Sequence, residues 1–156
     1  MSGLLILAGF LVTLSYVPLG IEPMTEVYFE DHSSLPKYIF LNKDYNFSFV
    51  IVNLEHQDVE YDYIIEVFNE KGELVSELDK GEVTLSHNQS LLTAEDFSMN
   101  ESFGRAKIQV TVIKKRVGEP EFKKGFWWED PNYSEEVRIH FWVEEIVPTT
   151  ITITDD

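Results

Sequence analysis

The chain has 156 residues and carries 28 acidic against 12 basic side chains, which gives a formal net charge of −16. This length accommodates one domain of ordinary size, and the 44% apolar content is too high for a disordered acidic tail. A surface this acidic repels phosphate backbones, so we predict no nucleic-acid partner. The absence of cysteine excludes a disulfide framework and a thiolate zinc site.

The N-terminal segment, residues 3–21, contains no charged side chain. As a helix, its 19 residues would span about 28 Å, close to the ~30 Å hydrocarbon core of a bilayer. Pro18 and Gly20 would weaken the end of this helix. A cleaved signal peptide or a buried core helix are alternatives, but no Lys or Arg precedes the apolar run and no face of it is polar. We therefore predict one transmembrane helix, an uncleaved anchor over residues 1–23 that contacts the lipid bilayer through residues 3–21.

Residues 24–156 are predicted to form an extracytoplasmic β-domain, because the apolar residues alternate with polar ones along most of this region. The predicted strands, in chain order, cover residues 24–31, 45–53, 58–68, 73–78, 82–86, 90–97, 105–115 and 137–143, with a further short one near Ile151 and Ile153. Turns are predicted at residues 69–72 and 79–81, each of which ends in glycine. Frequent turns between short strands indicate an all-β, immunoglobulin-like antiparallel β-sandwich.

Four Asn-x-Ser sites occur in this domain although the whole chain has only seven asparagines. With Ser and Thr together at 20 of 156 residues, chance would produce about one such site. The alternative explanation is that Asn and Ser cluster in turns for local hydrogen bonding. The excess favours N-linked glycans at all four sites, which are Asn46, Asn88, Asn100 and Asn132.

The sequence contains no recognisable catalytic motif. The four histidines are scattered, no Gly-x-Ser-x-Gly elbow or phosphate-binding glycine loop is present, and the acidic pairs lack the spacing of a dedicated calcium loop. We therefore predict no enzyme, no cofactor and no metal site. Glu55 and His56 are predicted to form a polar turn between two strands, with Asn53 capping the backbone.

The most suggestive loop is the one around Lys123–Pro131, which contains two of the three tryptophans. We single out Phe126, Trp127 and Trp128 as candidate partner contacts, because exposed aromatic rings serve as interface anchors, membrane-interface residues or sugar-stacking platforms. The alternative is that these rings fold back and cap one end of the sandwich.

Several segments resemble the archaeal envelope family called domain of unknown function 1616. They are Thr25–Phe29, Val50–His56 before Tyr61, Val83–Ser90 and Arg138–Val143. The resemblance covers roughly residues 24–145 and implies an exported β-domain attached to an archaeal membrane, with no known activity to transfer. Members of the family look like proteins with several transmembrane helices, whereas this chain has a single apolar segment.

These observations predict a non-catalytic, membrane-anchored and glycosylated cell-surface domain that acts as an accessory or interaction subunit with other membrane protein subunits. Two alternatives stay open. In the first, the chain is a structural subunit of a surface filament or layer joined by strand addition, through the β-branched run Thr149–Thr154. In the second, it is an extracytoplasmic glycan- or solute-binding module that uses Trp127 and Trp128.

Overall fold

The computed structural model describes residues 23–115, 135–149 and 153, and within these residues the regular secondary structure is entirely β. Six strands fall where the alternation predicts them. The eight strands are β1 (Met24–Phe29), β2 (Tyr38–Ile39), β3 (Tyr45–Leu54), β4 (Val59–Asn69), β5 (Leu74–Leu85), β6 (Ser90–Phe97), β7 (Arg105–Lys115) and β8 (Glu135–Glu145).

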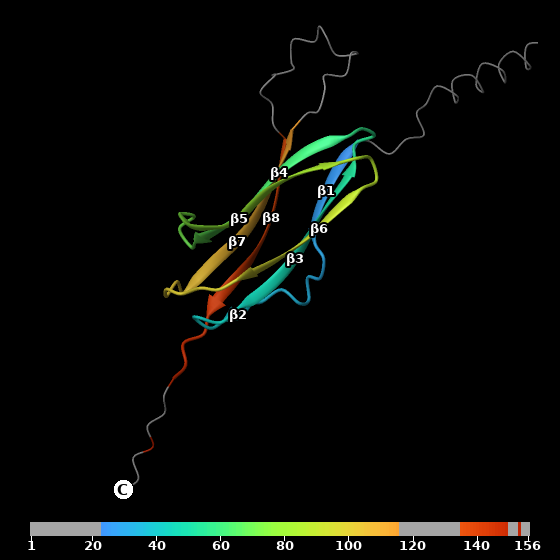
Figure 1. Cartoon of the computed structure of the whole chain (residues 1–156). Helices are drawn as coiled ribbons and strands as arrows, with labels where there is room; N and C mark the ends of the chain where they lie inside the picture. The colour runs from blue at the N-terminus through green and yellow to red at the C-terminus, as the bar shows by residue number, and fades with distance from the viewer. Residues whose placement is uncertain (1–22, 116–134, 150–152, 154–156) are drawn as a thin grey trace, which may run out of the picture.

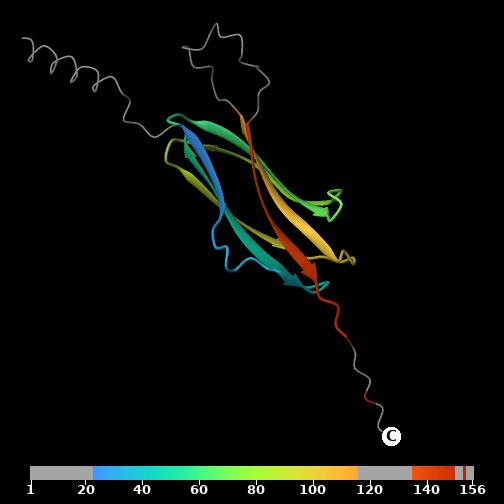
Figure 2. The same ribbon diagram turned by 180° about the vertical axis from the view of Figure 1, so that it is seen from behind.

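The strands form two facing sheets, one of three strands in the order β1-β3-β6 and one of five strands in the order β2-β8-β7-β4-β5. Figures 1 and 2 show the sheets lying against each other, with the chain passing from one to the other several times. This arrangement is the immunoglobulin-like sandwich, so the predicted fold class of the β-domain is confirmed. All pairings are antiparallel except that of β2 with β8, which is parallel.

The core lies between the sheets and consists of the inward residues of each alternating strand. Phe49, Tyr61 and Ile65 are fully buried, and Phe47 and Phe141 pack edge to face with ring centroids 5.2 Å apart. Burial of such side chains stabilises the sandwich by about 1.5–3 kcal/mol each relative to exposure. The alternation of apolar residues is therefore what selects this fold.

The turn predicted at residues 79–81 is wrong, because β5 continues through Gly81 as one strand. Gly81 pairs with Tyr63 across the sheet, and a Cβ added at position 81 would lie 2.4 Å from the Tyr63 hydroxyl. The tyrosine ring thus covers the glycine and fills the place of a side chain. The turn predicted at residues 69–72 is confirmed, with Gly72 at φ 80°.

The chain after β8 does not continue the sandwich within the described residues. Ile146–Thr149 form no strand, and Ile153, also outside any strand, is 81% exposed. The rest of the predicted terminal strand lies outside the described residues. So does the predicted anchor, and across residues 23–115, 135–149 and 153 no helix is long and apolar enough to span a membrane.

Candidate functional site

One end of the sandwich is organised by Asn53, whose side chain is completely buried. Its Nδ2 donates to the carbonyls of Gln57, at 2.8 Å, and Leu85, at 2.7 Å. Its Oδ1 accepts from the backbone N–H of Glu55 at 2.8 Å, which confirms the predicted cap. Because these bonds reach both the β3–β4 turn and the end of β5, one amide holds two connections together.

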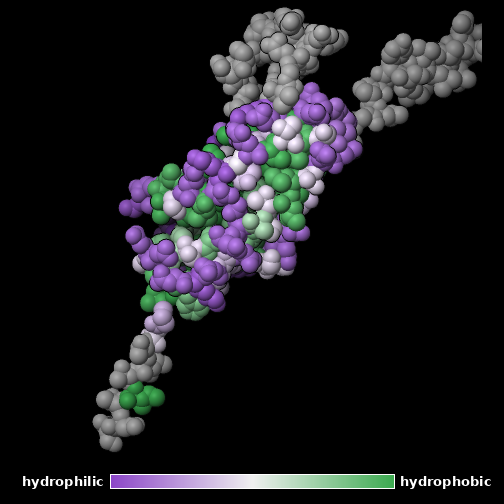
Figure 3. Space-filling model, viewed as in Figure 1, coloured by the Kyte–Doolittle hydropathy of each residue, from purple (hydrophilic) through white to green (hydrophobic). Residues whose placement is uncertain are grey.

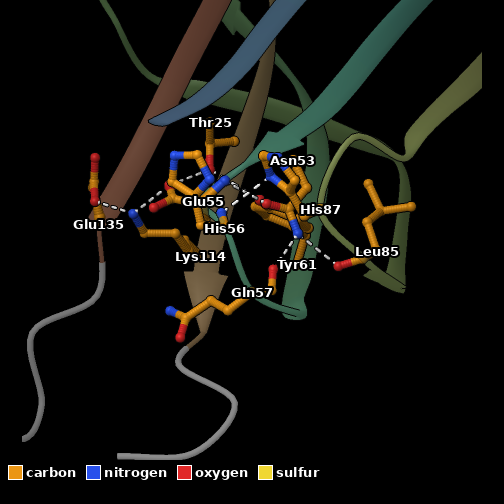
Figure 4. A network of polar contacts seen from close by, with 10 residues as sticks. All are labelled: Thr25, Asn53, Glu55, His56, Gln57, Tyr61, Leu85, His87, Lys114 and Glu135. Atoms are coloured by element: carbon orange, nitrogen blue, oxygen red, sulfur yellow. Dashed lines mark hydrogen bonds and ion pairs between the residues drawn. The ribbon is translucent and has the colours of Figure 1, made fainter. Parts of the chain in front are cut away.

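A charged network next to Asn53 joins the two sheets (Figure 4). Thr25 of β1 donates to Glu55 Oε1 at 2.8 Å and lies 2.9 Å from the Tyr61 hydroxyl. Lys114 of β7 binds the same Glu55 oxygen at 2.8 Å and also pairs with Glu135 of β8. The Glu55 side chain is only 8% exposed, so its charge is compensated by the lysine and the hydroxyl.

Burial and hydrogen bonding shift the pKa of Lys114 in opposite directions. Burial works to lower the pKa of Lys114, but hydrogen bonds with Glu135 and Glu55 outweigh it, so the pKa is raised and the ammonium stays charged. Burial is also the main reason why the pKa of Tyr61 is raised. The tyrosine therefore stays a neutral phenol at ordinary pH.

Two histidines lie beside this network at the surface. His56 and His87 come from different turns, and their rings lie 4.5 Å apart. The backbone N–H of His56, a residue with φ 63°, donates to His87 Nδ1 at 3.1 Å. The pair links the turn after β3 to the turn after β5, as Asn53 does from inside.

The network marks the end at which two undescribed segments join the domain. Thr25 is near the point where residues 1–22 connect, while Lys114 and Glu135 flank the connection to residues 116–134. Direct contacts through Glu55 place these attachment points together. The loop with Phe126, Trp127 and Trp128 lies outside the described residues, so its contacts stay a prediction.

Three of the four predicted glycosylation sites are described, and all three asparagines are exposed. Asn46 lies in β3 opposite Asp96, Asn88 occupies the turn between β5 and β6 at φ 66°, and Asn100 follows β6. These positions border the three-stranded sheet. Asn132 lies outside the described residues.

A group of three carboxylates is found on the outer face of the five-stranded sheet. Oxygens of Glu60, Asp62 and Glu82 lie within 4.8 Å of one another, close enough to share a cation. The ammonium group of Lys115 lies between these carboxylates. Its Nζ is 2.6 Å from Asp62 Oδ2 and 3.6 Å from an oxygen of Glu60 and of Glu82. The hydrogen bond to Asp62 is the main reason why the pKa of Lys115 is raised. The group is therefore an ion-pair cluster that contains its own cation.

A pair of carboxyl groups lies where β5 of one sheet faces β6 of the other. Asp79 pairs in register with buried Ile65, and Glu95 with buried Phe47, so both carboxyls face inward. Burial, followed by a hydrogen bond with Asp79 and the negative charges of Asp79 and Asp96, raises the pKa of Glu95 to about 7. The proton shared across this edge connects one sheet to the other.

These polar groups hold strands and turns together. Within the described residues, none of the arrangements combines a nucleophile with an adjacent base. The sequence predicted the cap by Asn53 and the turn at Glu55. It missed the partners Thr25, Lys114 and Glu135. Lys114 was the available signal, because it continues the inward alternation of Val110 and Val112 in β7 and a charged residue on an inward face requires a partner.

The two facing sheets define an immunoglobulin-like β-sandwich domain, and the chain is similar to three solved structures. A CARDB domain from Pyrococcus furiosus, solved in complex with di-metal ions, matches with a TM-score of 0.50 at 16% identity, covering 81% of this chain and 91% of that one. The complex of zinc 2-glycoprotein and prolactin inducible protein from human seminal plasma matches at 0.49 and 8% identity, covering 83% and 99%. A PapD-like domain of human CEP192 matches at 0.45 and 12% identity, covering 85% and 97%.

At these identities the likeness to the CARDB domain shows the fold alone. No known family matches the sequence, and no curated protein matches it either. The resemblance to domain of unknown function 1616 therefore stays a prediction.

Replacing Asn53 with Ala is expected to destabilise the domain by about 3 kcal/mol, because it leaves two carbonyls and one N–H without their partner. Urea unfolding followed by circular dichroism measures this change. Asn100→Ala, at an exposed asparagine of the loop after β6, is the matched control and should change stability by less than about 0.5 kcal/mol. Equal effects of the two substitutions would contradict the role given to Asn53.

Stability should fall as the pH rises from about 4.5 to about 7, because the folded domain holds a proton on Glu95 that the unfolded chain releases near the ordinary pKa of 4.5. Below that range the carboxyl is protonated in both states and its contribution is fully present. The contribution is lost as the pH passes the folded pKa of about 7. Urea unfolding of wild type and Glu95→Gln between pH 5 and 8 measures the difference.

The glutamine variant should remove this part of the pH dependence, whereas Glu70→Gln, at an exposed turn residue, should retain it. A wild-type profile parallel to that of Glu95→Gln across the whole range would show that the shared proton does not contribute to stability.

Proposed function

We propose that this chain is a non-catalytic, membrane-anchored and N-glycosylated domain on the outside of an archaeal cell, acting as an accessory or interaction subunit of a membrane protein complex. Residues 3–21 provide the anchor in the bilayer, and residues 24–156 form the exterior domain. The aromatic loop contacts another membrane protein subunit beside the membrane.

The observation that supports this proposal most is the convergence of two attachment points at one end of the sandwich. Thr25, next to the predicted anchor, and Lys114 and Glu135, which flank the aromatic loop, share contacts with Glu55. A helix that anchors the chain at Met24 would therefore bring both attachment points of the loop with Phe126, Trp127 and Trp128 to the level of the bilayer surface. Aromatic residues at that depth favour contact with a membrane-embedded partner or with the headgroup region.

The distribution of charge and sequons supports the same orientation. All 40 charged side chains lie after residue 21, which keeps an exterior domain soluble beside the membrane. Asn46, Asn88 and Asn100 are exposed, as glycan acceptors must be.

Expression of the full chain in an archaeal host and extraction in mild detergent should yield a complex much larger than the 18.1 kDa chain, together with glycopeptides that contain the predicted asparagines. Substitution of Trp127 and Trp128 by Ala should lower co-purification of the partner by about tenfold, the effect of losing one buried aromatic anchor. Tyr38→Ala, at a ring that is 61% exposed in β2, is the control and should have no effect. A protein that migrates alone would contradict the proposal.

A second candidate, strand addition between copies or to a neighbour, is favoured by the C-terminal residues. Thr149 and Ile153 belong to no strand of this sandwich, and Ile153 is 81% exposed. A terminal run of alternating Thr and Ile has the composition that completes the edge of another sheet. Strand β5, at the edge of the five-stranded sheet, offers such an acceptor.

Deletion of residues 147–156 should abolish polymers while the domain unfolds at an unchanged temperature, because β8 ends at Glu145. Electron microscopy of surface preparations and thermal unfolding measure the two properties. Polymers that persist after the deletion would eliminate the strand-addition hypothesis.

A further inference from the structure

The two sheets differ in the basic residues that they contain. The strands of the three-stranded sheet, β1, β3 and β6, contain no Lys, Arg or His. The five-stranded sheet contains Lys80, Arg105, Lys107, Lys114, Lys115 and Arg138. All the basic side chains of the sandwich strands therefore belong to one sheet.

On the five-stranded sheet the outward cations are already paired within the domain. Lys115 is held by three carboxylates, and Arg138 pairs with Glu136. Arg105 covers the Trp142 ring, with its guanidinium carbon 4.4 Å from the ring centroid, and Lys107 lies 4.9 Å from that of Phe68. These four cations therefore have partners within the domain.

The outer face of the three-stranded sheet instead combines seven apolar side chains with Glu26, Asn46, Ser48, Ser90 and Asp96, and its middle row is entirely apolar. Tyr28, Val50 and Leu92 lie side by side in one row across β1, β3 and β6, because Tyr28 pairs with Val50 and Val50 with Leu92. Tyr28 is 43% and Leu92 56% exposed. Figure 3 shows hydrophobic residues gathered along the side of the molecule that these strands form. We call this surface the apolar face, made of Met24, Tyr28, Val50, Val52, Leu54, Leu92 and Ala94.

All charged side chains within β1, β3 and β6 are acidic. Glu26 pairs with Val52, Asp96 pairs with Asn46, and exposed Glu30 follows β1. A second copy of the chain would bring the same acids against these, and an anionic lipid surface would be repelled as well. The complementary surface is an apolar patch on another protein with Lys or Arg at its margin.

The sequons restrict the direction from which such a partner approaches. Asn46 points outward at the start of β3, the lower end of the apolar face in Figure 1, so a glycan there would cover that end. Asn88 lies at the opposite end, in the turn before β6, so the row of Tyr28, Val50 and Leu92 lies between the two predicted glycan sites.

We propose that the apolar face docks a membrane-embedded partner subunit through an apolar surface of that partner with a basic margin. This inference rests on the proposed function and adds to it the contact surface and the chemistry of the partner.

The test uses the full chain in archaeal membranes with a photo-crosslinking amino acid at position 92 or at position 74. Leu74 is a matched control, because it is 57% exposed in β5 of the other sheet. We expect adducts from position 92 to one membrane protein, with the crosslinked peptide apolar and flanked by Lys or Arg. Leu92→Glu should lower co-purification of that protein by about tenfold, and Leu74→Glu should not.

The acidic margin is tested separately. Glu26→Lys combined with Asp96→Lys should weaken co-purification by at least about threefold, and higher salt should weaken the wild-type complex, since both reduce the attraction between opposite charges. Circular dichroism of each purified variant shows whether it is folded, and all four positions are on the surface. Folded charge-reversal variants that retain full co-purification would overturn the assignment of a basic partner surface.

The remaining outcomes separate this inference from the proposed function. Adducts from position 74 alone, or equally from both positions, to a partner that co-purifies would overturn the docking face and leave the proposed function standing. Adducts at twice the chain mass, or lipid adducts only, would also overturn it, in favour of a second copy or the membrane. A chain that purifies alone and forms no adduct at either position would overturn both.

Discussion

The buried amide of Asn53 is the interaction on which the organised end of this domain depends. A buried polar group must be satisfied, and Asn53 meets this requirement by binding the turn after β3 and the end of β5 at once. The Glu55 turn that it shapes then receives Thr25 from one sheet and Lys114 from the other. The attachment points of the predicted anchor and of the aromatic loop are consequently held next to each other.

Polar pairs lie at two margins of the apolar core. The Glu55–Lys114 pair fills the end at which the predicted anchor connects, and the protonated Glu95 carboxyl bridges the edge between β5 and β6. Inward-facing charges of this kind also protect sheet edges from pairing with other chains, because they make an added strand costly. Strand addition at β5 would therefore have to avoid the region of Asp79.

The proposed partner contact is argued from how charge is divided between the two sheets, and not from the net charge of the chain. A chain with net charge −16 is expected to repel most acidic surfaces, yet its basic strand residues are all on one sheet and already paired there. The other sheet is left with an apolar surface and acids at its margin. Position 92 thus differs from position 74 in its surroundings, although the two leucines are almost equally exposed.

Sequence alone determined the fold class of the β-domain, six of the strands, the 69–72 turn and the cap by Asn53, because period-two alternation and turn chemistry are local properties. Tertiary structure decided what depends on residues distant in the chain. Gly81 lies within a strand because Tyr63 covers it, and β2 forms by pairing with β8. Lys114 contacts Glu55 and Glu135 only because folding brings β7 next to β8 and to the turn after β3. Likewise, the apolar face exists only once Tyr28, Val50 and Leu92 are brought into one row, since cross-strand register cannot be read from a single strand.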